Sequence, residues 1–513
     1  MASSKTNRRN LLKVMGMFPA AITLVPLAKI FPSTSKTSPH IIIVVCDAWA
    51  AHNTSLYGYP RPTMPNIEKF AKRSTVYNHH YSAGNFTVPG TASLLTGMYP
   101  WTHRAINLGG MIKNSLGDNQ IFKALYDTHK GIGYVQNVYA DQLINQARAY
   151  LKTHIPFGAY NLQDGVFYDS PLFNLDAYTA FSSFEDGIIN HGKGFDGSVW
   201  LGPLARLFRI RNKRIINNAM SEEYYAGLPE SLDPFLLSDV VDGLIDTLTN
   251  LTEPSVVYFH MFAPHDPYRP YSKHYNGFRD DEYSPNTAPT HPLVSEPNSD
   301  HELRISRLNY DAFLASLDQE LARLFNYFDA SGLKDDSYIF LTSDHGEMFD
   351  HGMRGHSDPL LFEPLIHIPL VVSAPGQFER HDVDTPTSSV DVLPTICHIT
   401  KNEIPDWSEG RLLPTLGGES DPERAVFSFS APQNSSFGNI TQYSISMVYK
   451  NNKLIKYNHP KYSKYEFYDL ANDPQEKLDL SDSLPEIGIE MVKELDKLLP
   501  SILTMKIPED GNK

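Results

Sequence analysis

The chain has 513 residues, with 44 Lys and Arg, 59 Asp and Glu, and a formal net charge of −15. This length suits one large α/β domain with a smaller second unit, and the acidic balance argues against general binding of nucleic acid, which needs basic patches. Two cysteines without CxxC spacing exclude a disulfide framework and a cysteine-based metal site.

Residues 1–38 have the pattern of an export signal. The pair Arg8-Arg9 precedes an apolar run from Val14 to Ala28, which is shorter than a membrane span and is interrupted by prolines. The pattern predicts a twin-arginine-type leader and an exported, periplasmic or extracellular protein. A fraying basic tail is the alternative, and membrane contact is expected only if the leader is retained.

The next elements predict an α/β fold. A continuous β-branched run from His40 to Cys46 indicates a parallel strand that is buried on both faces and ends directly before Asp47. The hydrophobic pattern predicts further strands and helices along the chain: helices at 64–73, 236–251 and 304–333, and strands at 255–262 and 338–342. Strands alternating with helices predict a doubly wound, mostly parallel sheet flanked by helices.

The segment from Asn85 to Pro100 has the layout of a nucleophile at a helix N-terminus. Pro89 suits the first helical position, so we expect Thr87 just before the first turn. Free backbone N–H groups and the helix dipole favour an anion there. A hydroxyl in that place can attack a phosphorus or sulfur centre; an ordinary threonine cap ahead of a core helix is the alternative.

Three further side chains follow predicted strands at the end where α/β sheets bind ligands. Asp47 follows the first strand, and Asp344 and His345 follow the strand at 338–342. Two carboxylates and an imidazole make a plausible site for one divalent metal ion, with Zn²⁺, Mn²⁺, Ca²⁺ and Mg²⁺ all open. Such an ion would bind Thr87 Oγ, lower its pKa and neutralise charge on the attacked ester.

Five blocks in this order resemble the sulfatase family of the alkaline phosphatase superfamily. They are Asp47 with 57–67, 87–100, 263–268, 342–347 with Gly355-His356, and 453–456 with 468–474. The resemblance implies a sulfatase-like catalytic domain at 39–415 and a smaller C-terminal α+β subdomain at 416–513. It implies that Asp47, Asp344 and His345 hold the metal and that Thr87 is the nucleophile. His265 and His356 would contact the transferred group or protonate the leaving group, and a loop hydrogen bond is the alternative for each.

The chain also departs from the family pattern. Typical sulfatases carry Cys-x-Pro-x-Arg, with the Cys or a Ser converted to formylglycine, whereas this chain has Thr87, Pro89 and Thr91. Threonine cannot become formylglycine, and the arginine that steadies the nucleophile is missing. Ala48 stands where many sulfatases have a second aspartate ligand. His345 in place of an asparagine favours a softer ion such as Zn²⁺ or Mn²⁺.

These observations predict an exported, metal-dependent hydrolase or transferase that cleaves sulfate or phosphate esters through Thr87. The substrate would be a small-molecule, glycan or lipid-headgroup ester, and a site with one metal disfavours phosphate monoesters. A catalytically lapsed protein that binds an anionic glycan or acts as a scaffold is the alternative, favoured by Ala48 and Thr91. The aromatic-rich stretch at 148–234 is expected to be either a substrate-recognition lid or a packed surface insert.

Overall fold

The computed structural model describes residues 38–162, 201–279, 283, 285, 287–435 and 438–503. The predicted leader and residues 163–200 of the insert lie outside the described residues. In the part of the chain that is described, no helix combines the length and the apolar character that a membrane span needs.

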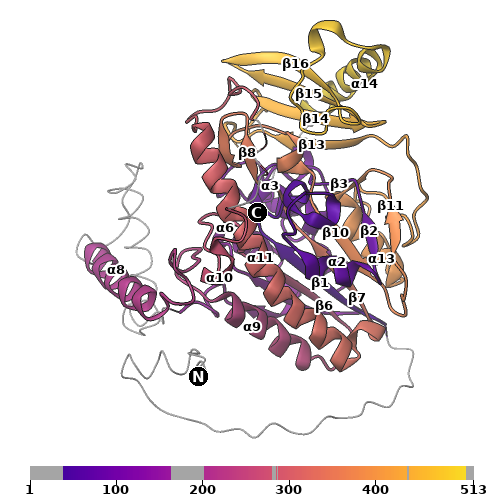
Figure 1. The fold of residues 1–513 in the computed structure, drawn as a ribbon. Helices are drawn as coiled ribbons and strands as arrows, with labels where there is room; N and C mark the ends of the chain where they lie inside the picture. The colour runs from indigo at the N-terminus through magenta and orange to yellow at the C-terminus, as the bar shows by residue number, and fades with distance from the viewer. Residues whose placement is uncertain are drawn as a thin grey trace, which may run out of the picture.

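An eight-stranded sheet forms the centre of the molecule (Figure 1). Its strands lie in the order β11-β2-β10-β7-β1-β6-β4-β5, and β7, β1, β6, β4 and β5 run parallel to one another. Strand β10 is antiparallel to both of its neighbours. The bounds are β1 (His40–Cys46), β2 (Thr75–Tyr77), β4 (Lys130–Val135), β5 (Leu151–Ile155), β6 (Ser255–Met261), β7 (Ser337–Thr342), β10 (Leu370–Ser373) and β11 (His381–Val383).

Helices cover both faces of this sheet. Along β1, Ile42 and Val44 face one hydrophobic cluster and Ile41, Ile43 and Val45 face the other, as the two-residue period of a strand requires. The first cluster includes side chains of α2 (Pro65–Ala71), α9 (Leu237–Thr249) and α11 (Asp300–Ser331). The second includes side chains of α3 (Thr87–Thr96), α6 (Val138–Gln146) and α13 (Val392–Ile399). The doubly wound fold predicted from the sequence is confirmed.

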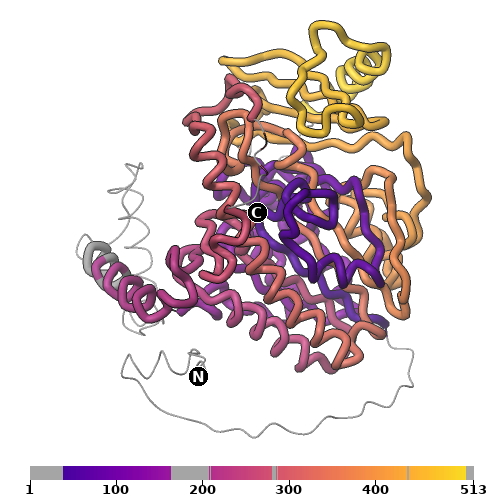
Figure 2. The backbone as a smooth tube through the Cα atoms, in the orientation of Figure 1, coloured from indigo at the N-terminus to yellow at the C-terminus, as the bar shows by residue number. Residues whose placement is uncertain are grey.

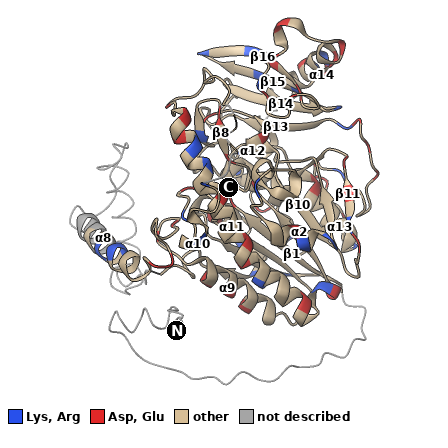
Figure 3. Ribbon diagram, in the orientation of Figure 1, with Lys and Arg blue, Asp and Glu red and all other residues tan. Residues whose placement is uncertain are grey.

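The long helix α11 shows how local sequence sets the boundaries of an element. Ser299 and Glu302 form a reciprocal capping box at its start, and Gly332 ends it in a left-handed conformation with φ of 73°. Its apolar side packs on the sheet, while both signs of charge appear along its length (Figure 3).

The sequence predicts the bounds of the strands more accurately than the start of α3. The helix begins at Thr87 because Gly90 N–H donates to the Phe86 carbonyl at 3.0 Å. Pro89 is therefore the third helical residue rather than the first, and Thr87 lies inside the first turn rather than before it. A proline is tolerated at that place because backbone N–H groups of a first turn have no helical partner.

The C-terminal part forms a separate antiparallel sheet, seen above the large sheet in Figure 2. It comprises β13 (Val426–Ser430), β14 (Tyr443–Tyr449), β15 (Asn452–His459) and β16 (Tyr462–Asp469). Helix α14 (Glu486–Leu503) packs Met491 and Leu495 on one face, and the opposite face joins the large unit through Tyr457 and its neighbours. Among the described residues, the remaining strands and α-helices are β3 (His80–Tyr81), α4 (Pro100–His103), α5 (Ile121–Ala124), α8 (Leu201–Ala219), α10 (Ser272–Tyr275), β8 (Met348–Asp350), β9 (Met353–Gly355), α12 (Glu363–Ile366) and β12 (Thr387–Ser388).

Candidate active site

Four neighbouring parallel strands deliver polar side chains to one edge of the large sheet. Asp47 directly follows β1, Asp344 lies two residues after β7, His260 is the penultimate residue of β6, and Asn137 lies two residues after β4. Since these strands are adjacent in the sheet and point the same way, their carboxyl ends bring the four side chains together. The structure brings Asp47 and Asp344 together at this edge, and His260 Nε2 lies near a carboxylate oxygen of each.

The N-terminus of α3 approaches the same edge. A Cβ atom on Gly90 would lie 2.2 Å from the carbonyl oxygen of Asp344, so only glycine allows the helix to come this close. One residue further along, Thr91 Oγ1 donates to Asp344 Oδ2 at 3.3 Å. This approach places Thr87, which is 4% exposed, above the strand ends.

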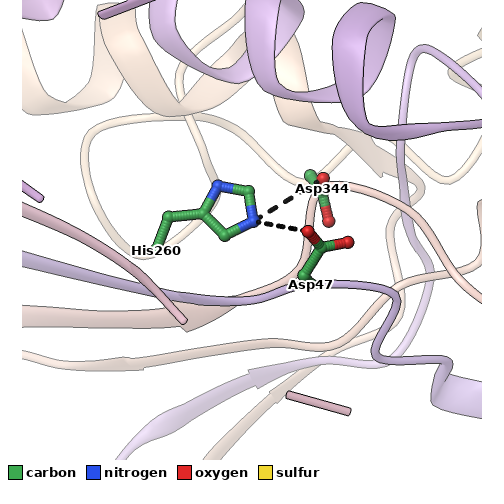
Figure 4. A group of neighbouring side chains, drawn as sticks. All are labelled: Asp47, His260 and Asp344. Carbon is green, nitrogen blue, oxygen red and sulfur yellow. Dashed lines mark ion pairs between the residues drawn. The ribbon is translucent and has the colours of Figure 1, made fainter. Parts of the chain in front are cut away.

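Asp47, His260 and Asp344 form a fully buried group with the character of a metal site. His260 Nε2 lies 3.4 Å from Asp47 Oδ2 and 3.8 Å from Asp344 Oδ2 (Figure 4). One ligand atom from each residue lies within 4.8 Å of the other two. Within the described part of the chain, neither Asp47 Oδ1 nor His260 Nε2 takes part in a hydrogen bond, although both atoms are buried. Buried polar atoms without partners are costly, so this pair of atoms fits a bound cation.

His345 connects this group to Thr87. Its Nδ1 atom faces the Gly346 carbonyl at 2.8 Å, which places a proton on Nδ1 and makes Nε2 the nitrogen that can bind a cation once it has lost its own proton. That Nε2 atom lies 3.2 Å from Thr87 Oγ1, 3.4 Å from Asp47 Oδ1 and 3.7 Å from Asp344 Oδ2. A carbonyl that fixes the far nitrogen is the usual support of a metal-binding histidine.

The carboxylates and imidazoles of the site shift one another's pKa values. Burial opposes ionisation of Asp47, but the imidazoles of His265, His260 and His345 together hold its pKa well below the usual range. Burial alone would lower the pKa of His345, yet the carboxylates of Asp344 and Asp47 raise it to about 9. Without a cation, the buried carboxylates are therefore balanced by protonated imidazole, and a bound cation would take over this role.

The two predicted catalytic histidines lie next to His345. The ring centroid of His356 is 4.3 Å from that of His345 and 4.9 Å from that of His265. His356 Nδ1 faces Glu347 Oε1 at 2.9 Å, and His265 Nδ1 faces the Asp266 carbonyl at 2.6 Å. Both histidines line a cavity of about 410 Å³ together with Thr87. The structure thus brings together all six side chains that the sequence singled out.

Three residues of the site were missed in the sequence. His260 follows an apolar run within its strand and shares its face with Tyr258, toward α3. Asn137 is the N-cap of α6 and follows a strand that was not predicted. Glu347 lies inside a block that was recognised, but its role in holding His356 depends on the fold. Asn85 donates from its amide nitrogen to the Asp358 carbonyl at 2.7 Å.

Comparison with known sequences finds sulfatases over most of the chain. A family model described as sulfatase matches residues 39–402, and one described as N-sulphoglucosamine sulphohydrolase, C-terminal, matches residues 351–501. An ulvan-active sulfatase of Formosa agariphila is 24% identical over 482 residues, which cover 93% of this chain and 82% of that protein. A choline-sulfatase of Rhizobium meliloti is 24% identical over 432 residues, which cover 82% of this chain and 78% of that protein.

Solved structures share the fold. The phosphonate monoester hydrolase of Agrobacterium radiobacter superposes with a TM-score of 0.65 at 19% identity, covering 91% of this chain and 96% of that one. A solved structure in complex with its substrate D-glucosamine-2-N,6-O-disulfate has a TM-score of 0.60 at 16% identity, and the match covers 93% of this chain and all of that one.

Proposed function

The chain belongs to the sulfatase family, and we propose that it is an exported, metal-dependent hydrolase that cleaves sulfate monoesters with Thr87 as its nucleophile. One observation carries the proposal. Thr87 is the first residue of α3, and its Oγ1 atom lies 3.2 Å from His345 Nε2. The same Nε2 atom also lies near the carboxylates of Asp47 and Asp344. A hydroxyl is thereby held between an anion-attracting helix end and a group built for a cation.

Asp47, His260 and Asp344 would hold the ion, with His345 Nε2 as the fourth donor. Two carboxylate oxygens and two imidazole nitrogens suit Zn²⁺ or Mn²⁺ better than Ca²⁺, which prefers six to eight oxygens. When bound, the ion would neutralise charge on the ester and lower the pKa of the Thr87 hydroxyl. Ala48 contributes no side-chain ligand, and the imidazole of His260 supplies a donor that the sequence pattern lacked.

The side chains suggest two displacement steps. Thr87 loses its hydroxyl proton to solvent and its oxygen bonds to sulfur, while the bond between sulfur and the ester oxygen breaks. The departing alcohol takes a proton from His265 or His356, the two imidazoles that line the cavity with Thr87. Water then attacks the sulfur of the threonine ester, the bond between sulfur and Thr87 Oγ1 breaks, and sulfate leaves. One proton of the water returns to the histidine and the other restores the Thr87 hydroxyl. Backbone N–H groups of the first turn of α3 face the charge that develops.

The choice of sulfate monoesters rests on the family and on charge. Relatives are named for ulvan and for choline sulfate, and a sulfate monoester carries one negative charge, which a single cation can balance. Phosphodiesters carry the same charge, so they are the expected second substrates, and transfer to an acceptor alcohol would use the same threonine ester. Export is supported by the Arg8-Arg9 pair and the apolar run that follows it.

A comparison of substrates tests the proposal. The protein reconstituted with Zn²⁺ or Mn²⁺, beside Thr87→Ala, is assayed with 4-nitrophenyl sulfate, 4-nitrophenyl phosphate, bis(4-nitrophenyl) phosphate and a 4-nitrophenyl phosphonate. We expect turnover of the sulfate ester, weaker turnover of the phosphodiester and loss of both in Thr87→Ala. Silence on all four substrates together with no bound metal would instead indicate a catalytically lapsed binding protein, the function that Ala48 and Thr91 favour.

A further inference from the structure

Asn137 stands between the predicted nucleophile and the predicted metal ligands. Its Nδ2 atom lies 2.7 Å from Asp47 Oδ2 and 3.3 Å from Thr87 Oγ1, and the residue is 4% exposed. A side-chain amide nitrogen can donate two hydrogen bonds and cannot accept one. One hydrogen therefore serves the carboxylate and the other serves the hydroxyl oxygen.

The orientation of this amide is fixed by its surroundings. Asn137 caps α6, and its side-chain oxygen accepts the Tyr139 N–H at 3.0 Å, which turns the nitrogen toward Thr87. The preceding residue ties the same turn to β6, because Gln136 N–H donates to the His260 carbonyl at 2.9 Å and Gln136 Oε1 accepts the Phe262 N–H at 3.0 Å. The donor is thus held by rigid elements on both sides.

From this geometry we infer that Asn137 is the positioning residue of the nucleophile. Its N–H group fixes the rotamer of Thr87 and stabilises the negative charge on Oγ1 once the proton has left, since hydrogen bonds to a charged acceptor are the stronger ones. Its second N–H occupies Asp47 Oδ2 and thereby leaves Oδ1, which makes no hydrogen bond with any described residue, turned to the cation. The inference rests on the proposed function.

The test compares Asn137→Ser with the wild type. Serine keeps the N-cap of α6 but is too short to reach both Thr87 and Asp47, so the protein should stay folded with only a small fall in melting temperature. We expect kcat for 4-nitrophenyl sulfate to fall about 10²-fold with little change in KM, because the lost donor acts on the nucleophile and not on the substrate. Asn145→Ser, in the exposed last turn of the same helix, should match the wild type.

A second readout does not need turnover. Orthovanadate mimics the five-coordinate state of the transferred group, and its affinity for the metal-loaded protein is measured by calorimetry. We expect Asn137→Ser to bind vanadate about tenfold more weakly than the wild type. If Asn137→Ser fails to fold, Asn137→Asp replaces it, because aspartate keeps the cap and the size and removes both N–H donors.

The outcomes distinguish failure of the inference about Asn137 from failure of the proposed function. Unchanged kcat and unchanged vanadate affinity in Asn137→Ser would overturn the inference, even where the wild type is an active sulfatase. A fall in both that goes with a large fall in melting temperature, in Asn137→Ser and Asn137→Asp alike, would also overturn it, because it would show a structural role only. A wild type that binds vanadate but hydrolyses nothing would refute the proposed function, and the vanadate comparison would still decide the role of Asn137. A wild type that neither binds vanadate nor turns over an ester would refute both.

Discussion

His260 presents its Nε2 atom 3.4 Å from Oδ2 of Asp47, and both side chains are fully buried at the carboxyl ends of adjacent strands. Asp344 completes the group from the strand on the other side of β1. The three residues come from positions that are far apart in the sequence, and the parallel register of the sheet unites them. A cation in this place would explain why Asp47 Oδ1 and His260 Nε2 make no hydrogen bond with any described residue.

Removal of His260 should weaken metal binding. We expect His260→Leu to lower the affinity for Zn²⁺ by about 10- to 100-fold, because a nitrogen donor is lost while both carboxylates remain. Calorimetric titration of the metal-free protein measures the affinity. Val257→Ala, on the opposite face of the same strand, controls for a general loss of packing and should bind as the wild type does. Equal affinities in His260→Leu and the wild type would remove His260 from the site.

Thr87 should be needed for chemistry and not for the fold. Thr87→Ala deletes a hydroxyl that hydrogen-bonds to His345 and Asn137, and we expect kcat to fall about 10³-fold or more with a small change in melting temperature. Thr87→Ser keeps the oxygen and should retain measurable turnover. Steady-state kinetics with 4-nitrophenyl sulfate measures both variants, and turnover that survives in Thr87→Ala would place the nucleophile elsewhere.

His265→Ala and His356→Ala should differ in how the loss of activity depends on the pKa of the leaving alcohol. A proton donor matters most for an alcohol of high pKa and little for 4-nitrophenol, so the histidine that protonates the leaving group should show a larger loss with an alkyl sulfate. We compare His265→Ala and His356→Ala on an aryl and an alkyl sulfate. Equal losses on both substrates would limit that histidine to binding of the transferred group.

Gly90 should be required for the approach of α3 to the strand ends. In Gly90→Ala the new methyl group would meet the Asp344 carbonyl at 2.2 Å, and relief of this clash must move either the helix or a metal ligand. We expect a loss of about 1–3 kcal/mol in the free energy of unfolding, together with weaker metal binding. Gly158→Ala, whose nearest contact would be an ordinary 3.6 Å, is the matched control.

Buried neutral histidines should make the protein sensitive to acid. His103 is fully buried with its Nδ1 accepting the Ala105 N–H at 3.1 Å, and burial lowers its pKa to about 3. The unfolded chain, with a pKa near the usual value of about 6.5, binds the proton first as pH falls, so stability is lost between about pH 6.5 and pH 3. His80, with its pKa also lowered to about 3 by burial, should add to this loss.

Urea unfolding at several pH values measures the effect. His103→Gln should reduce the slope of unfolding free energy against pH by up to about 1.4 kcal/mol per pH unit. His381→Gln, at an exposed position on β11, should leave the slope unchanged. An unaltered slope in His103→Gln would show that His103 accepts a proton in the folded protein.

The sequence predicts the strands and the residues that follow them better than the residues within them. Asp47 and Asp344 were recognisable because each follows an apolar run, and a polar residue at that point belongs to the ligand-binding edge. His260 lies inside such a run, where a single histidine is usually a core residue, and only the register of β6 against β1 shows that it meets Asp47. Asn137 is the N-cap of α6 and follows β4, a short strand in which glycines interrupt the apolar residues. That pattern is too weak to predict the strand from the sequence.

The most direct test of the account is rapid-quench mass spectrometry of the metal-loaded protein during turnover of 4-nitrophenyl sulfate. We predict that the peptide containing Thr87 carries one additional sulfuryl group on the threonine, and that the modification disappears when the substrate is exhausted. Turnover without this adduct, persisting in Thr87→Ala, would contradict the central claim that Thr87 is the nucleophile.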